Sequence, residues 1–541
     1  MSATDATTAS ASSISSGLYT RQSSGLVRDI SPLSNAILNI SFVSIPLAVF
    51  VATQAPYAFP GANPFWVTVI CVGVCVLPVM LYSLFMAVMP RSGGDYVFVS
   101  RTLNPWLGFA ANFNIVAWYV LVIAYFAYLL APSALGTAFV SIGVAAHSAT
   151  FTEWGATLAE SKGWQFGIGA GALILCAAMM TTSLRRMLSI QQVLFWLSLL
   201  CVAISIVLLL FNGRGDFEGA VANFGGNYHG MIAAAKAGGY AGSSHFDLGN
   251  TLLALPLAFA SFGYAIVSSY AGSEVRSPKS SGARSMMWAL IASGVVTAIL
   301  MLLASRTFGN NFLGSATYLN YMEDKHYVFG APSGFFFYVS MLTSSTPVII
   351  VLNLSVVIAY FVALPVTFLI TTRSLFAWSF DRILPEAVSE VNPRTRSPLI
   401  ATVIVLIVGL IYLALIVWGS SNFLSLLYTA GMGELLTFIV VAIAGIVFPF
   451  SRKAMYEGSA INRKIFGLPA LTVVGIGALV LYIFFFISLA TQDALGANEG
   501  SGVRTMIIIA VIGILIYPVS YLINRRRGVD LGLAFRQLPP E

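Results

Sequence analysis

Twelve apolar stretches, each about 20 residues long, constrain this chain more than any other feature, because a helix needs roughly that length to cross a bilayer. They cover residues 33–56, 64–88, 105–130, 165–182, 190–211, 249–271, 286–308, 347–373, 398–418, 422–449, 468–490 and 503–523. Only 9% of the residues are charged, whereas soluble domains carry about 25%. The pattern predicts an all-α membrane protein of about 12 transmembrane helices, with membrane lipid as its solvent. The apolar residues 334–346 predict a further outer-loop helix or an extension of the eighth span.

The two ends of the chain differ from this apolar body. Residues 1–30 are rich in Ser, Thr and Ala and contain neither an apolar core nor a basic leader. We therefore expect a disordered tail rather than a signal peptide. The predicted organisation is a transmembrane domain over residues 31–523, followed by a tail over residues 524–541.

The distribution of positive charge predicts the orientation. With an even number of spans, both termini lie on one side of the membrane, and all but six of the 27 Lys and Arg residues fall on that side. The six exceptions are Lys162, Lys236, Lys325, Arg214, Arg306 and Arg504. Because positive loops stay in the cytoplasm, both termini are expected to be cytoplasmic, most simply at the plasma membrane. The net charge of +7 reflects this topology and gives no reason to expect nucleic-acid binding.

Two spans carry helix-breaking residues near their centres. Residues 39–46 read Asn-Ile-Ser-Phe-Val-Ser-Ile-Pro, and residues 256–264 read Pro-Leu-Ala-Phe-Ala-Ser-Phe-Gly-Tyr. A proline removes a backbone hydrogen bond, and in lipid such a break survives only where it faces protein or a water-filled cavity. These spans begin two groups of five helices, and paired breaks of this kind predict a substrate site at the bilayer midplane. An ordinary proline kink without a site is the alternative.

Three connecting segments carry recognisable motifs. Residues 90–96 read Pro-Arg-Ser-Gly-Gly-Asp-Tyr, residues 271–278 read Ala-Gly-Ser-Glu-Val-Arg-Ser-Pro, and residues 373–385 read Arg-Ser-Leu-Phe-Ala-Trp-Ser-Phe-Asp-Arg-Ile-Leu-Pro. These three motifs, in this order and at these positions between spans, resemble the loop motifs of amino acid permeases of the amino acid–polyamine–organocation superfamily. The resemblance covers nearly the whole chain.

The resemblance implies a leucine-transporter-like fold. That fold would consist of two inverted five-helix repeats, over residues 33–211 and 249–449, plus two extra helices over residues 468–523. It also implies that the substrate binds where the first and sixth spans unwind, with backbone amides holding a carboxylate. The implied binding residues are Ser41, Val43, Ser44, Ile45, Pro46, Phe259, Ala260, Ser261, Phe262, Gly263 and Tyr264. The third span adds polar and aromatic candidates, or ordinary packing residues, at Asn112, Asn114, Trp118 and Tyr119.

The sequence departs from the family pattern at two points. The break in the first span has serines and a proline where the family usually has glycines, which affects how closely a carboxylate can approach the backbone. Residues 191–198 of the fifth span contain no lysine, so the coupling lysine of some proton-driven members has no counterpart here.

The loop motifs also supply a candidate gate at the cytoplasmic ends of the spans. Gly93 and Gly94 allow a sharp backbone turn. Arg91, Glu274 and Asp381 can contribute to ion pairs that close the site from the cytoplasm. The alternative is that these charges only fix topology and loop shape.

Glu434 is the sole acidic residue deep within a span. A charge at mid-bilayer costs about 2.5–3.5 kcal/mol, and no Lys or Arg lies at that depth in the sequence. We weigh three roles for this carboxyl: a proton carrier for coupling, a partner for a substrate ammonium group, and a neutral carboxyl in an interhelical hydrogen bond.

Together these features predict a secondary active transporter that moves amino acids by alternating access, as a symporter, antiporter or exchanger. The coupling ion is expected to be a proton rather than sodium. No phosphate-binding loop and no metal-ligand spacing is present in the sequence, so we expect no cofactor, no metal and no enzymatic activity. The alternatives are transport of polyamines or other small organic amines, and a non-transporting membrane receptor or enzyme.

Overall fold

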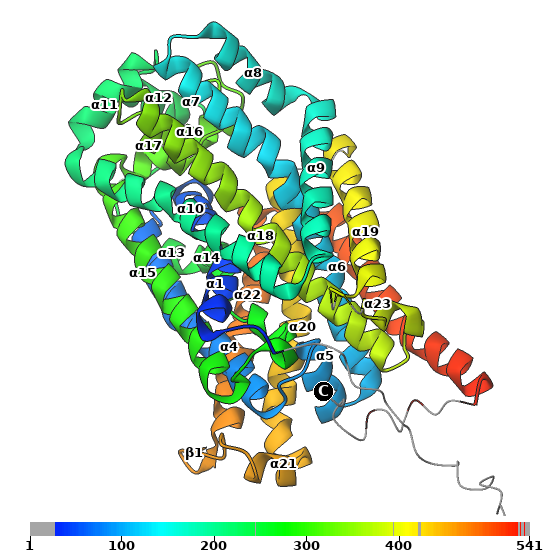
Figure 1. The fold of residues 1–541 in the computed structure, drawn as a ribbon. Coiled ribbons are helices and arrows are strands. Elements are labelled where there is room, and N and C mark those ends of the chain that lie inside the picture. The colour runs from blue at the N-terminus through cyan, green and yellow to red at the C-terminus, as the bar shows by residue number, and fades with distance from the viewer. Residues whose placement is uncertain are drawn as a thin grey trace, which may run out of the picture.

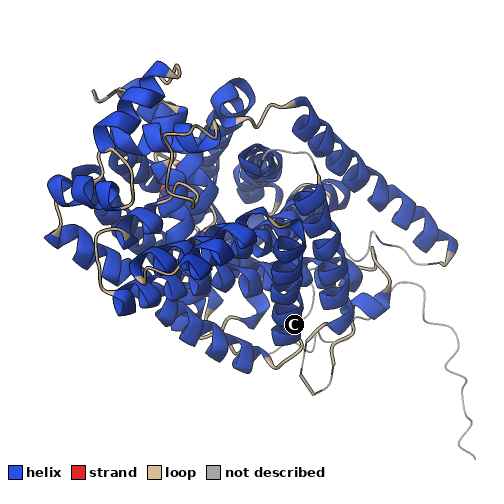
Figure 2. Ribbon diagram, turned by 90° about the horizontal axis from the view of Figure 1, so that it is seen from above, coloured by secondary structure: helices blue, strands red, loops and turns tan. Residues whose placement is uncertain are grey.

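The computed structural model describes residues 28–243, 245–392, 394–395, 397–419, 423–528, 531 and 535. Helices make up nearly all of this part of the chain (Figures 1 and 2). A small antiparallel hairpin joins β1, Lys464–Ile465, to β2, Leu468–Pro469. The predicted all-α membrane fold is confirmed.

Eleven helices within the described residues are long and apolar enough to cross a membrane, and the shorter α13–α14 pair completes the twelve predicted crossings. In chain order the crossings are α1 Pro32–Val43 with α2 Ile45–Thr53, α4 Pro64–Val88, α6 Pro105–Leu129, α9 Lys162–Met180, α10 Leu184–Phe211, α13 Leu248–Leu253 with α14 Leu255–Phe262, α15 Ala283–Thr307, α18 Thr346–Phe380, α19 Leu399–Trp418, α20 Phe423–Ser451, α22 Ala470–Thr491 and α23 Gly500–Arg526.

Shorter helices cover the two ends of the bundle (Figure 1). The end that we call the loop face carries α3 Ala55–Ala58, α8 Ala149–Glu160, α11 Arg214–Asn223, α12 Tyr228–Ala237, α16 Asn310–Tyr321 and α17 Phe335–Ser340. The opposite end, which we call the terminal face, carries α5 Asp95–Thr102, α21 Lys453–Glu457 and the hairpin. Helices α11 and α12 lie between the fifth and sixth crossings, and α16 and α17 between the seventh and eighth.

Four of the first five crossings each pack against a crossing from later in the chain. Helix α2 packs against α14, α4 against α15, α6 against α18, and α9 against α19. In each case a crossing of the first half meets the crossing five places later in the chain.

Two crossings extend beyond their predicted ends. The third does not stop at residue 130 but continues through a π-helix, Leu130–Gly136, into α7, Thr137–Ala145. The π-turn accommodates Pro132, which lacks the N–H that an α-helix requires. The eighth runs to Phe380 because most of the motif after residue 373 is a buried helix, and the turn begins only at Asp381. Residues 334–346 form the separate helix α17 instead of prolonging this crossing.

Candidate substrate site and terminal-face closure

The first crossing is interrupted at Ser44, as its sequence predicts. Helix α1 ends at Val43, and Ser44 adopts a left-handed conformation with φ 50° and ψ 88° before α2 begins. The Ser44 N–H still donates to the carbonyl of Ile40 at 2.9 Å. Pro46 lies in the first turn of α2, where its missing N–H costs nothing because that position has no intrahelical acceptor.

The sixth crossing is interrupted just after the predicted serine. Helix α14 ends at Phe262, and from Gly263 the chain continues in turns and in the short 3₁₀ helices η2, Val267–Tyr270, and η3, Gly272–Glu274. A β-carbon at Gly263 would lie 2.5 Å from the Phe259 ring, so the turn requires glycine. The Ser261 hydroxyl donates a hydrogen bond to the Val43 carbonyl. The two interruptions are therefore adjacent and joined directly.

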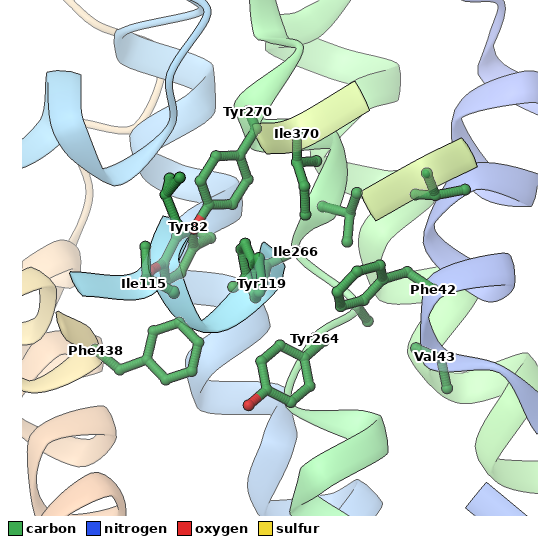
Figure 3. Close-up of a cluster of buried hydrophobic side chains, with 14 of the residues drawn as sticks. Phe42, Val43, Tyr82, Ile115, Tyr119, Tyr264, Ile266, Tyr270, Ile370 and Phe438 are labelled. Carbon is green, nitrogen blue, oxygen red and sulfur yellow. The ribbon is translucent and has the colours of Figure 1, made fainter. Parts of the chain in front are cut away.

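Aromatic rings and one carboxyl surround the joined breaks. The Phe42 ring centroid lies 5.7 Å from those of Tyr119 and Tyr264, and the two tyrosine centroids are 6.3 Å apart. Figure 3 shows these rings between the unwound segments and α6. The Tyr264 hydroxyl donates to the carboxylate of Glu434, which projects from α20. The acidic residue singled out by sequence thus lies at the breaks.

Two hollows flank the start of α2, and Pro46 lines both. The smaller has a volume of about 270 Å³ and lies beside Ser41 and Ser44, against α10 and α18. The larger, of about 520 Å³, extends from Pro46 toward α17, and residues 332–337 line it. The larger hollow therefore lies on the side of the first break that faces α17.

The residues predicted for the substrate site do not all face the breaks. Ser41, Ser44, Ile45 and Pro46 line the smaller hollow, Val43 and Ser261 form the link between the crossings, and Phe259 packs beside Tyr264 with ring centroids 6.1 Å apart. Phe262 is buried in the main core, and Ala260 is half-buried.

Asn114 and Trp118 instead hold α20 against α6. The Asn114 amide donates to the Gly433 carbonyl at 2.7 Å and to the Thr437 hydroxyl at 3.0 Å. A β-carbon at Gly433 would lie 2.2 Å from the indole nitrogen of Trp118. Both side chains therefore contact the residue preceding Glu434 and position that carboxyl.

Two buried ion pairs lie at the terminal face. Glu274 is paired with Arg373, with Nη2 and Oε2 2.8 Å apart and both side chains at most 2% exposed. Asp381 is paired with Arg101 at 2.7 Å. Both acidic residues of the predicted gate thus have arginine partners, but neither partner is Arg91, whose guanidinium donates to the Pro90 carbonyl at 3.3 Å.

Aromatic side chains support the second of these pairs. The Tyr96 hydroxyl donates to Asp381 at 2.6 Å. The Phe535 ring, near the end of the chain, lies 4.7 Å from the Arg101 guanidinium carbon. A cation–π contact of this kind favours the charged form of an arginine that is removed from water.

The two glycines of the first motif bring α5 against the sixth and eighth crossings. Gly93 and Gly94 have φ angles of +100° and +49°, which favour glycine. The Gly93 N–H donates to the Tyr270 carbonyl at 2.9 Å. A β-carbon at Gly93 would lie 2.7 Å from that of Ala377. Glycine is required here by both conformation and space.

Sequence reasoning did not single out Asp95 and Tyr270. Asp95 begins α5, is fully buried, and accepts a hydrogen bond from the Asn112 amide at 3.2 Å. Tyr270 faces it from the end of η2. Asp95 lies inside the 90–96 motif, and a charged residue directly after the two glycines of that motif was the available signal.

Comparison with known protein families adds an independent finding. A family model described as amino acid permease matches residues 30–517. That range includes both interruptions, both ion pairs and all twelve crossings except the last turns of α23. No curated protein that was compared matches the sequence.

Proposed function

Because this chain belongs to the amino acid permease family, within the amino acid–polyamine–organocation superfamily, we propose that it is a secondary active permease that carries amino acids across the plasma membrane by alternating access. The family and the many apolar helices establish a multi-pass membrane protein that transports amino acids or similar small molecules. The proposal adds the substrate position, the coupling and the orientation.

The observation that carries the proposal is the meeting of two interrupted crossings in the middle of the bundle. The first N–H groups of α2 follow directly on Ser44, and free N–H groups at a helix start bind carboxylates. The hydroxyls of Ser41 and Ser44 lie beside the same hollow. If the carboxylate of an amino acid bound there, the aromatic rings of Phe42 and Tyr264 would lie on the side of the bound amino acid's side chain.

Glu434 is the proposed coupling group. Its side chain is 2% exposed, and no Lys, Arg or His within the described part of the chain forms an ion pair with it. A buried carboxyl without a cation favours its neutral form, and a substrate ammonium group or a proton can supply the missing positive charge. This supports proton coupling through Glu434 at the substrate site.

The two faces of the bundle support alternating access. The Glu274–Arg373 and Arg101–Asp381 pairs close the terminal face, whereas the larger hollow lies toward the loop face. The terminal face also collects most of the Lys and Arg residues, and we assign it to the cytoplasm. Release into the cytoplasm then requires both ion pairs to separate.

Transport of a small amine is a second candidate function. A buried carboxyl beside tyrosine and phenylalanine rings is a favourable environment for an organic cation. Glu434 and the Tyr264 ring form such a pair. A diamine substrate would use these groups without needing the N–H groups of α2.

Uptake by proteoliposomes tests these functions directly. The purified protein would be given a panel of labelled L-amino acids and labelled putrescine, with imposed proton and sodium gradients in turn. We expect accumulation of at least one amino acid, driven by an inward proton gradient. Uptake of putrescine alone would favour the amine transporter, and binding without flux in any condition would refute a transport function.

A further inference from the structure

Four buried carboxyls lie along the path between the breaks and the terminal face, and two of them have no cation. Glu274 and Asp381 are paired with arginines. Asp95 and Glu434 form no ion pair with any Lys, Arg or His in the ranges that the structure describes. The two unpaired carboxyls require a separate explanation, because burying a lone charge is costly.

Tyrosine hydroxyls connect these two carboxyls. The Glu434 carboxyl accepts a hydrogen bond from Tyr264, whose ring centroid lies 6.3 Å from that of Tyr119. The rings of Tyr119 and Tyr270 have centroids 5.9 Å apart, and the hydroxyl of Tyr270 interacts with the Asp95 carboxyl. Figure 3 shows the three tyrosines in one cluster, with Tyr270 and Tyr264 on opposite sides of Tyr119.

The polar atoms of this cluster have unused hydrogen-bonding capacity. Asp95 Oδ1 and the hydroxyls of Tyr82, Tyr119 and Tyr270 are buried and have no partner of ordinary hydrogen-bond geometry within the described structure. An unsatisfied buried polar atom costs about 1–3 kcal/mol. Each such group in a folded protein calls for an explanation, and a change of hydrogen-bond partner during function is one.

The side chains named here around Asp95 are uncharged. Asn112 and Tyr119 face it from α6, Tyr82 from α4, Tyr270 from η2 and Tyr482 from α22. The nearest arginine on its own helix, Arg101, is engaged with Asp381. Burial accordingly raises the pKa of Asp95 from 3.8 to about 6, and the nearby Tyr270 hydroxyl and the hydrogen bond from Asn112 only partly oppose that shift.

We propose that Asp95 is a second proton-binding carboxyl, reached from Glu434 through the hydroxyls of Tyr119 and Tyr270. This inference rests on the proposed transport function and extends its coupling step. The Glu434 carboxyl loses a proton to the Tyr119 oxygen while the Tyr119 proton passes to Tyr270 and the Tyr270 proton to the Asp95 carboxylate. Each tyrosine ends neutral, because a hydroxyl both donates and accepts, and the carboxylate charge moves from Asp95 to Glu434.

A purely structural role for Asp95 makes a different prediction. As the first residue of α5, its carboxylate would stabilise the helix N-terminus by the helix dipole. Asparagine is also well tolerated at helix starts and keeps the hydrogen-bonding shape of the side chain. The substitution Asp95→Asn therefore separates helix stabilisation from proton binding.

The test compares wild-type protein with Asp95→Asn in proteoliposomes that enclose a pH-sensitive dye. The matched control is Asp216→Asn, because Asp216 lies in the first turn of α11 on the loop face. The probes are labelled L-amino acids and putrescine. For Asp95→Asn we expect labelled-for-unlabelled exchange to stay within about twofold of wild type. Proton-driven uptake and substrate-induced proton movement should fall at least tenfold. A measured pH titration of the carboxyl infrared band should lose one component in this variant.

Each other outcome counts against the inference. Unchanged proton-driven uptake in Asp95→Asn would show that Asp95 only stabilises α5, and equal loss of exchange and proton-driven uptake would show a structural role. Wild-type transport without any response to a proton gradient would refute this inference while leaving the permease function intact. Absence of flux from the wild-type protein itself would instead refute the proposed function.

Discussion

The arginine-paired carboxylates Glu274 and Asp381 and the carboxyls Asp95 and Glu434, which lie among tyrosines, are similarly buried but have different surroundings. Glu274 and Asp381 are each 1% exposed, and Asp95 and Glu434 are 0% and 2% exposed. Only the first two face a guanidinium. Burial therefore does not distinguish the two groups, and they differ in the side chains that they contact.

The difference matches the two roles that we propose, with the arginine-paired carboxylates in closure and the tyrosine-bonded carboxyls in coupling. A carboxylate paired with arginine stays charged and forms a strong directional contact, which suits a closure that opens only when the pair separates. A carboxyl bonded to tyrosine can gain or lose a proton without breaking its packing. The following predictions test this division, from the largest expected effect to the smallest.

Breaking the Glu274–Arg373 pair should have the largest effect on stability. Removing one partner of a buried ion pair costs about 3–5 kcal/mol, whereas replacing both by apolar residues costs far less. We expect Arg373→Leu to lower the apparent melting temperature in detergent strongly, and Glu274→Leu with Arg373→Leu to recover much of the loss. Equal melting temperatures for the single and double variants would indicate that Glu274 binds a proton, as we propose for Asp95 and Glu434.

The contribution of Asp95 to stability should depend on pH. Its pKa is raised from 3.8 to about 6 in the folded protein, so between these values the folded state binds more protons than the unfolded state. Stability therefore falls as pH rises from about 4 to about 6, by up to about 3 kcal/mol. We expect wild type, measured relative to Asp95→Asn, to melt at a higher temperature at pH 5 than at pH 7. If the difference in melting temperature between wild type and Asp95→Asn were the same at pH 5 and pH 7, the Asp95 carboxyl would be ionised throughout this range.

Neutralising Glu434 should impair transport while leaving the fold intact. Glu434→Gln keeps an acceptor for the Tyr264 hydroxyl, so we expect stability to change by less than about 1 kcal/mol. Proton-driven uptake should fall at least tenfold, and its pH dependence should disappear. The control Glu160→Gln changes an exposed residue at the end of α8 and should behave as wild type. Unchanged uptake and pH dependence in Glu434→Gln would end the coupling role.

The smallest effect is expected at the first break. Ser44 has a positive φ of 50°, which costs a residue with a β-carbon about 1 kcal/mol relative to glycine. We expect Ser44→Gly to raise the melting temperature slightly and to retain transport, and Ser44→Val to lower both. A destabilised Ser44→Gly would show that the serine hydroxyl, rather than the backbone shape, maintains the break.

Local features of the structure could be predicted from the sequence because their causes are local. The length of each apolar run sets the crossings, Pro46 places the first interruption within two residues, and the Gly93–Gly94 pair marks the turn with positive φ angles. The family resemblance added the relation between the two halves, and the match over residues 30–517 confirms that family.

Pairings between distant residues could not be predicted in the same way. Glu274 and Arg373 are 99 positions apart, and their sequence motifs do not show which arginine each acid meets. The Asp95 cluster combines side chains from four separate crossings and one loop helix. Asn114 and Trp118 face α20 rather than the breaks because the rotation of α6 is set by packing against Gly433.

The length of α18 has a mechanical consequence. Its 35 residues form a rod of about 50 Å, well beyond the roughly 30 Å of the hydrocarbon core. Asn353 near one end borders the larger hollow, and Arg373 near the other end holds Glu274. In the proposed transport cycle, a tilt of α18 about its middle would narrow the opening at one end of the protein while it widened the opening at the other.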